Sequence, residues 1–331
     1  MSNKQKVDLA TTTNITTTYV GEFAGKYIKA SILNANTLSA GGFEIMPNVK
    51  FQSTLKRGTM AGLIKNAACD FDASGSITLT EKVITPKRLH VNLQVCKNDY
   101  RADWESSQMG FSAWDNLPPL FSDFIMAFVS ESVAEQTENN IWSGDESVDG
   151  EFDGIETQIA LDAALPAANE VAGTTSSVAN IVAELTKIVV AIPAAVYGKE
   201  GMKLYLPKNM IQNYIIAMGG HYVAGATPFT GMGGAGTDGK GQQWYTNGSL
   251  TFAGLPIFMA NGLTADTAFA TYSSNFVFAT GLLNDNQKVQ LIDMEPLDGS
   301  DNVRVVMKYT AAATYKIVED IVTYGITNGA N

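Results

Sequence analysis

Apolar residues recur at helical spacing most clearly in the stretch that follows Pro118 and Pro119. Proline is favoured in the first turn of a helix, and glycine often follows the last turn, so this pattern predicts one helix that ends before Gly144. A helix of about 24 residues would be about 36 Å long. Its apolar positions are Leu120, Phe121, Phe124, Ile125, Phe128, Val129, Val133, Ile141 and Trp142.

A period of two appears between residues 43 and 95 and predicts a long two-stranded excursion in which each strand has one buried face. Pro47 interrupts the outgoing strand, and residues 56–76, which contain several glycine and aspartate residues, form the tip. Because a long isolated hairpin is only marginally stable in water, this excursion needs a neighbour to lie on. The alternating residues on the return are Ile77 and Leu79, then Leu89, Val91, Leu93 and Val95.

The rest of the chain mixes helices and strands without an internal repeat, which predicts an α+β fold. Residues 97–116 suggest a short helix and a turn, residues 145–175 an acidic loop and an alanine-rich stretch, and residues 219–248 a glycine-rich loop. We expect further helices at 177–192 and 207–218. We expect strands at 203–206, 249–252, 256–259, 276–279, 288–292, 303–309 and 314–322.

Residues 1–42 are rich in Thr, Ser, Asn, Ala and Gly and show little periodicity. Such a segment cannot bury enough apolar surface to hold one conformation alone. It is therefore interpreted as an arm that becomes ordered against another surface.

Composition narrows the classes of function. The net charge of −11 and a pI of about 4.7 argue against sequence-specific nucleic-acid binding, because an acidic chain gains nothing from counterion release. No apolar run reaches the roughly 18–20 residues that span a bilayer, and residues 1–23 lack the apolar centre of a signal peptide. Cys69 and Cys96 are too few for a disulfide framework and fit a reducing cytoplasm. Only 17% of residues are charged, which is typical of a chain that hides surface against partners.

Motifs of catalysis and cofactor binding are weak. Residues 231–236 match GxGxxG, but no strand precedes them and no helix follows, so no nucleotide site is expected. Residues 149–154 resemble half of a calcium loop, but Ala160 stands where the twelfth-position glutamate is needed. His90 and His221 are the two histidines and lie in no recognisable catalytic setting. We therefore predict no catalytic residue, no metal and no cofactor.

Positive charge on the tip of the excursion and glycines in the later loop are the candidate contacts between subunits. Exposed cations on the tip could meet carboxylates of a neighbour, each pair contributing about 0–1 kcal/mol. Glycines in the later loop allow close backbone packing. The candidates are Lys56, Arg57, Lys65, Gly231, Gly233 and Gly234.

The order of these elements resembles the Hong Kong 97-type capsid fold of tailed bacteriophages. The resemblance is carried by VNLQVCKNDYRADWE, by VAEQTENNIWSGD with GIETQI, by LYLPKNMIQNYIIAMGG and LTFAGLPIFMANGL, and by VRVVMKYTAAATYKIVEDIVTYG. It implies an N-terminal arm (1–42), an E-loop (43–95), a peripheral domain with a long spine helix (96–155 and 276–331) and an axial domain (156–275). The autocatalytic cross-link of some family members is not carried over, because no partner for Lys56 or Lys65 can be identified.

The resemblance further implies a major capsid protein that assembles with itself into hexamers and pentamers. These would close an icosahedral phage head around double-stranded DNA, without sequence-specific binding, in the cytoplasm of a host bacterium. Separate scaffold and portal proteins and decoration proteins are the other expected partners; a separate scaffold is expected because only a short arm follows Met1. The alternatives are an encapsulin-type nanocompartment shell, a soluble α+β enzyme, and a phage tail or baseplate protein.

Overall fold

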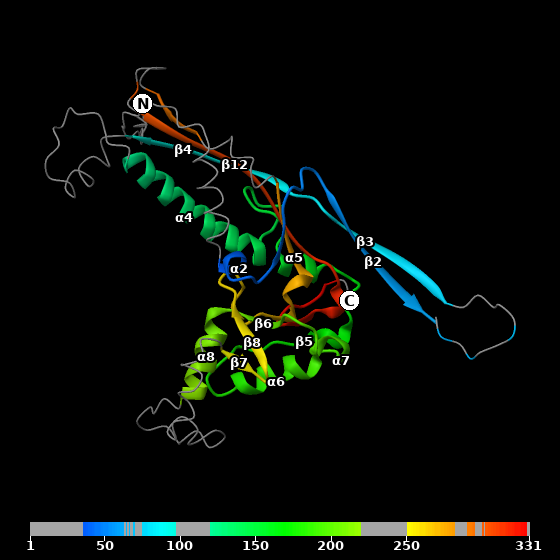
Figure 1. The fold of residues 1–331 in the computed structure, drawn as a ribbon. Helices are drawn as coiled ribbons and strands as arrows, with labels where there is room; N and C mark the ends of the chain where they lie inside the picture. Colours follow the sequence, from blue (N-terminus) through cyan, green and yellow to red (C-terminus); the bar gives the residue numbers. More distant parts are fainter. Residues whose placement is uncertain are drawn as a thin grey trace, which may run out of the picture.

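The computed structural model describes residues 36–62, 64, 66, 69, 75–96, 120–219, 250–281, 290–294, 300 and 302–329. Within these residues the fold is α+β, as the sequence predicts (Figure 1). The helices are α2 (Asn36–Ser39), α4 (Leu120–Ser143), α5 (Ile155–Ala160), α6 (Ile181–Ala191), α7 (Ala194–Tyr197) and α8 (Lys208–Gly219).

The strands of the described residues form three sheets. The first is a two-stranded hairpin of β2 (Ser53–Ala61) and β3 (Ser76–Ile84). The second joins β1 (Glu44–Met46), β4 (Lys87–Cys96), β10 (Phe276–Thr280), β11 (Gln290–Asp293) and β12 (Asn302–Tyr315). The third has the order β5 (Glu170–Val171), β13 (Val322–Tyr324), β9 (Ala268–Tyr272), β6 (Met202–Leu206), β8 (Leu255–Met259) and β7 (Thr251–Phe252).

The long helix has the predicted bounds, Leu120–Ser143, and its 24 residues confirm the expected length. Gly144 ends it for a reason that spacing alone does not give. A Cβ on Gly144 would lie 2.3 Å from the carbonyl oxygen of Phe152, so only glycine lets the following loop pass this close. The N–H of Gly154 then donates to the carbonyl of Gly144 at 2.9 Å, and the two segments are locked together.

Two large cores lie in the described part of the body. One is aromatic and surrounds the fully buried Trp142, whose ring packs against Phe43, Tyr205, Phe269 and Phe276 at centroid distances of 5.1–5.9 Å. The other lies between the third sheet and helices α6 and α8, which Figure 1 shows together with α7 in the lower lobe. The first core therefore joins α4 to both large sheets.

Several predicted elements are wrong in extent or pairing. β4 is not the return strand of the hairpin, because Lys87–Cys96 pairs antiparallel with β12. β12 is one strand rather than two, and residues 314–322 are not a strand, since β12 stops at Tyr315 and a 3₁₀ turn, Val318–Asp320, precedes β13. Alanines 311–313 have low β-propensity and hid this continuity, which pairing with β10 enforces.

Other elements were missed. Helix α5 and strand β5 lie in the predicted acidic and alanine-rich loop, and α2, α7 and β9 had no prediction. The predicted helices at 177–192 and 207–218 appear as α6 and α8. The helix and turn expected within residues 97–116 and most of the glycine-rich loop lie outside the described residues.

Candidate functional site

The hairpin β2–β3 projects from the body as a separate two-stranded ribbon (Figure 1). Each strand has nine residues, which corresponds to about 30 Å at 3.3 Å per residue. The register pairs Thr54 with Val83, and it continues without interruption to Ala61 and Ser76. Because directly paired residues share a face and faces alternate along a strand, the register divides the side chains into two sets.

One face of the ribbon is apolar towards its tip, and we call it the apolar face. It carries Met60 paired with Ile77 and Gly58 paired with Leu79. Met60 and Ile77 are each 62% exposed, and Leu79 is 70% exposed. Leu79 lies beside Gly58, and its Cδ2 is 3.5 Å from where a Cβ on the glycine would stand. A contiguous exposed apolar patch of this kind marks an interaction surface.

Nearer the body the apolar face becomes mixed. Lys56 and Glu81 are paired across the strands and their side chains form an exposed ion pair at 3.3 Å. Val83, which is also exposed, follows on the same face. The apolar face thus has an apolar outer half and a mixed inner half, in which an ion pair is followed by Val83.

The opposite face of the ribbon is polar and rests on its own subunit. The guanidinium of Arg57 donates to Glu319 Oε2 at 2.7 Å. Further in, Lys82 Nζ lies 3.6 Å from Asp162 Oδ2 and 3.1 Å from the ring centroid of Tyr315. Tyr315 in turn donates its hydroxyl hydrogen to the same Asp162 carboxylate.

The root of the ribbon is apolar and closed. Ile84 is buried against Val49, Ala279 and Ala312. The backbone N–H of Val49 donates to the carbonyl of Thr280 at 3.1 Å, which fixes the incoming chain beside β10. Among the described residues, the ribbon is therefore anchored at its root, contacts the body through two ion pairs on one face, and is uncovered on the other.

A buried polar cluster fixes the chain just before β1. Glu138 of α4 accepts hydrogen bonds from the backbone N–H of Thr37 at 3.0 Å and from its hydroxyl. The indole N–H of Trp142 donates to Thr37 Oγ1 at 2.8 Å and to Glu138 Oε1 at 3.3 Å. Helix α4 therefore fixes the position of Thr37 in α2.

The structure describes the positions of two of the six predicted contact residues. Lys56 and Arg57 lie on opposite faces of the hairpin, and both have partners in their own chain, Glu81 and Glu319. Lys65, Gly231, Gly233 and Gly234 lie outside the described residues. Contacts of all six with a neighbouring subunit stay predictions.

Sequence reasoning misjudged the alternating residues of the return strand. It assigned Ile77 and Leu79 to a buried face, but in the subunit they are exposed. The period of two correctly predicted the strand. It does not indicate which surface covers the apolar side of that strand. Met60 completes the apolar face. It was missed because its neighbours Thr59 and Ala61 are not strongly polar, so the alternation of apolar and polar residues is not visible there.

The carboxylates of the calcium-like motif accept hydrogen bonds from backbone N–H groups of the loop after α4. Glu151 accepts the N–H of Asp145 at 3.1 Å, and Asp153 accepts that of Glu146 at 2.8 Å. Within the described part of the chain no group of three or more His, Cys, Asp or Glu side chains could hold a metal ion. His90 is exposed on β4, and His221 lies outside the described residues.

None of the helices that the structure describes is long and apolar enough to cross a membrane. Cys69 is exposed, Cys96 is buried, and no disulfide joins them.

Comparison with solved structures identifies the architecture. A chain from the capsid of a native GTA particle superposes with a TM-score of 0.54 at 11% identity over 89% of each chain. A chain from Mycobacterium phage Adephagia has a TM-score of 0.54 at 12% identity, covering 86% of this chain and 84% of the other. A chain from Microbacterium phage Oxtober96 has a TM-score of 0.51 at 12% identity, covering 86% of this chain and 90% of the other.

No protein-family model and no curated protein matches this sequence. The structural similarity therefore concerns the fold, and it confirms the Hong Kong 97-type capsid fold that the order of elements predicts.

Proposed function

We propose that this chain is a major capsid protein, a structural subunit that assembles with itself into hexamers and pentamers of an icosahedral phage head. The proposal rests on one observation: the subunit has a capsid fold and carries a projecting hairpin whose apolar face finds no cover on its own chain among the described residues. An enzyme has no evident use for such a ribbon, whereas a closed lattice supplies a covering neighbour to every subunit by symmetry.

The neighbour that covers the hairpin is a second copy of this chain. The apolar outer half excludes water against that copy, and the ion pair between Lys56 and Glu81 lies beside the contact. Burial of each exposed apolar side chain favours association by about 25 cal/mol per Å² of apolar surface. Repeated around a capsomer, such contacts favour the closed ring over isolated subunits.

The division into an arm (1–42), an E-loop (43–95), a peripheral domain (96–155 and 276–331) and an axial domain (156–275) belongs to this proposal. The projecting part of the E-loop is Ser53–Ile84, since the flanking strands β1 and β4 pair with β10 and β12 in the body. The third sheet with α6 and α8 corresponds to the axial domain, with β13 added from the end of the chain.

The interior of the shell holds double-stranded DNA without sequence-specific contacts. A chain with net charge −11 does not bind a polyanion tightly, which suits a genome that enters and later leaves. Scaffold, portal and decoration proteins complete the proposed partners. The assembled protein resides in the virion, and assembly takes place in the cytoplasm of the host.

Electron microscopy of the purified full-length chain tests the proposal. Closed icosahedral particles or capsomer rings are the expected result. Compact monomers under every condition of concentration and salt would contradict it.

A pair of variants on adjacent residues tests the role of the apolar face. Leu79→Asp places a charge in the apolar patch, and Thr78→Asp places the same charge on the opposite, polar face of the same strand. Both positions are exposed, so neither variant should unfold the subunit. We expect Leu79→Asp to abolish particles and rings, and Thr78→Asp to retain them. Assembly of Leu79→Asp at the wild-type level would show that this face is not the contact.

A further inference from the structure

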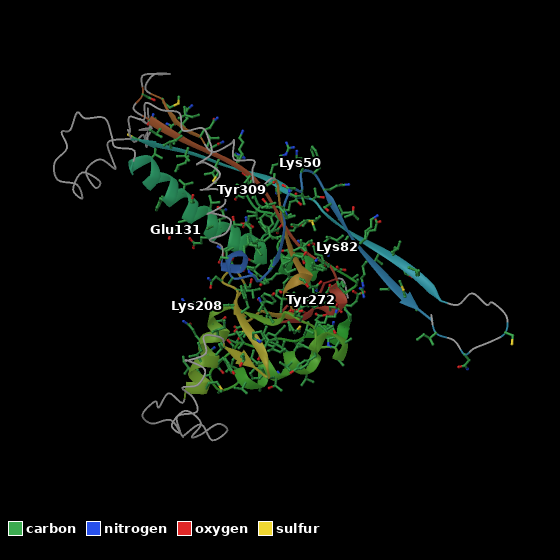
Figure 2. All side chains as sticks on the ribbon, viewed as in Figure 1. Lys50, Lys82, Glu131, Lys208, Tyr272 and Tyr309 are labelled. Atoms are coloured by element: carbon green, nitrogen blue, oxygen red, sulfur yellow. The ribbon has the colours of Figure 1, made fainter. Side chains whose placement is uncertain are left out.

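The contact between Lys82, Tyr315 and Asp162 lies where the hairpin leaves the body. Figure 2 shows Lys82 at this junction, between the projecting ribbon and the body. Between the root residue Ile84 and the tip, two ion pairs join the hairpin to the rest of the described chain. They are Lys82 with Asp162 and Arg57 with Glu319. The Lys82 contact is the inner one, next to the buried root, where a small rotation moves the tip furthest.

We propose that Lys82 is a pH-dependent latch, which docks the hairpin on its own subunit more firmly when its ammonium group loses its proton. The three components come from separate elements: Lys82 from β3, Tyr315 from the end of β12, and Asp162 from the loop after α5. The latch therefore links the angle of the ribbon to the packing of the body. The latch is a property of the single subunit and does not depend on the proposed assembly into a shell.

Burial opposes the charged form of Lys82, whereas the ring of Tyr315 and the carboxylate of Asp162 favour it. Lys82 is only 30% exposed, whereas Lys56 on the apolar face is 67% exposed. Removing an ammonium group from water costs free energy, and an ion pair offsets that cost only when its geometry is excellent. At 3.6 Å the pair with Asp162 is longer than the 2.7 Å pair between Arg57 and Glu319.

The pKa of Lys82 agrees with this geometry. Burial lowers it from the ordinary 10.5 to about 8, although the charge and hydrogen bond of Asp162 act in the opposite direction. When the hairpin swings away, Lys82 becomes exposed and its pKa returns towards 10.5. Between these two values the docked state binds fewer protons, so docking strengthens as the pH rises through 8.

The groups that face Lys82 do not titrate in the same range. Burial raises the pKa of Asp162, but hydrogen bonds from Tyr315 and Ala164 and the charge of Lys82 together bring it below its usual value. Burial, followed by the hydrogen bond to Asp162, raises the pKa of Tyr315 above its usual value. Leu55, the residue of β2 paired with Lys82, is apolar. Between pH 7 and 9, Lys82 is thus the group of this contact that changes charge.

Resonance energy transfer in the unassembled full-length chain tests the latch. Donor and acceptor dyes are attached to the exposed Cys69 and to Val190→Cys, a position on α6 that is 78% exposed, whereas Cys96 is buried. The ratio of docked to undocked hairpins should rise about tenfold between pH 7 and 9, since one proton is released over the range above pH 8.

Two methionine variants make the test specific. Lys82→Met keeps an apolar stem without a charge, so the hairpin should stay docked at pH 7 and the pH dependence should disappear. Lys56→Met removes the matched lysine from the other face and should retain the tenfold change. A flat wild-type profile, a pH-dependent Lys82→Met variant, or loss of the dependence in Lys56→Met would each overturn the proposal.

Discussion

The strands β3 of the hairpin and β6 of the body both carry apolar side chains, but they use them differently. In β6, Leu204 and Tyr205 are fully buried between helices and neighbouring strands of the same chain. In β3, Ile77 and Leu79 face outwards from a ribbon on which no other described element packs as a second layer. The body therefore buries its apolar strands within its own chain, whereas the hairpin depends on its root, on its polar contacts with the body and on whatever covers its apolar face.

The largest effect on stability is expected at the centre of the body. Trp142→Ala removes a fully buried ring that contacts four other aromatic rings and donates hydrogen bonds to Thr37 and Glu138. The free energy of unfolding should fall by about 3–5 kcal/mol. Urea denaturation followed by circular dichroism measures this loss. A loss in the free energy of unfolding of less than about 1 kcal/mol would show that the aromatic core contributes little to the stability of the body.

A smaller effect is expected where the chain enters the body. Glu138→Ala leaves the buried N–H of Thr37 without its acceptor, while Trp142 can still donate to the hydroxyl of Thr37. The expected loss is about 1–3 kcal/mol, the usual cost of a buried unpaired donor.

Glu135→Ala is the matched control for this prediction, because Glu135 is exposed on the same helix one turn away. It should change the free energy of unfolding by less than about 0.5 kcal/mol. Equal losses in the two variants, measured by the same denaturation experiment, would mean that the buried cluster does not explain the effect.

The contrast between body and hairpin also explains which parts of the fold could be predicted from the sequence. The long helix was predicted with its bounds because its apolar spacing, the prolines before it and Gly144 after it are all local signals. The continuity of β12 was not predictable, because alanines 311–313 carry little strand signal and are held extended by pairing with β10. Likewise, β4 shows clear alternation, but no local feature reveals that its partner is β12, more than 200 residues away.

The candidate site was predictable only in outline. The excursion and its need for a neighbour followed from composition and period. Lys56 and Arg57 lie on the excursion, but within strand β2 and not on the tip where they were predicted. Which side chains share a face depends on the register between β2 and β3, and the loop between them does not encode that register in a recognisable turn. The contact of Lys82 with Asp162 and Tyr315 joins three distant segments, so no sequence pattern could have indicated it.

The smallest effect on subunit stability is expected on the apolar face, and it sharpens the comparison most directly. Leu79→Thr shortens a side chain that is already in water, so the free energy of unfolding of the lone subunit should change by less than about 0.5 kcal/mol. Leu204→Thr makes the same exchange at a fully buried strand position and should cost at least about 2 kcal/mol, because it leaves a cavity and buries a hydroxyl group. Denaturation of both variants alongside the wild type separates the two regions. If Leu79→Thr destabilised the lone subunit as much as Leu204→Thr, the apolar face would be packed on its own chain, and the argument for a covering neighbour would lose its basis.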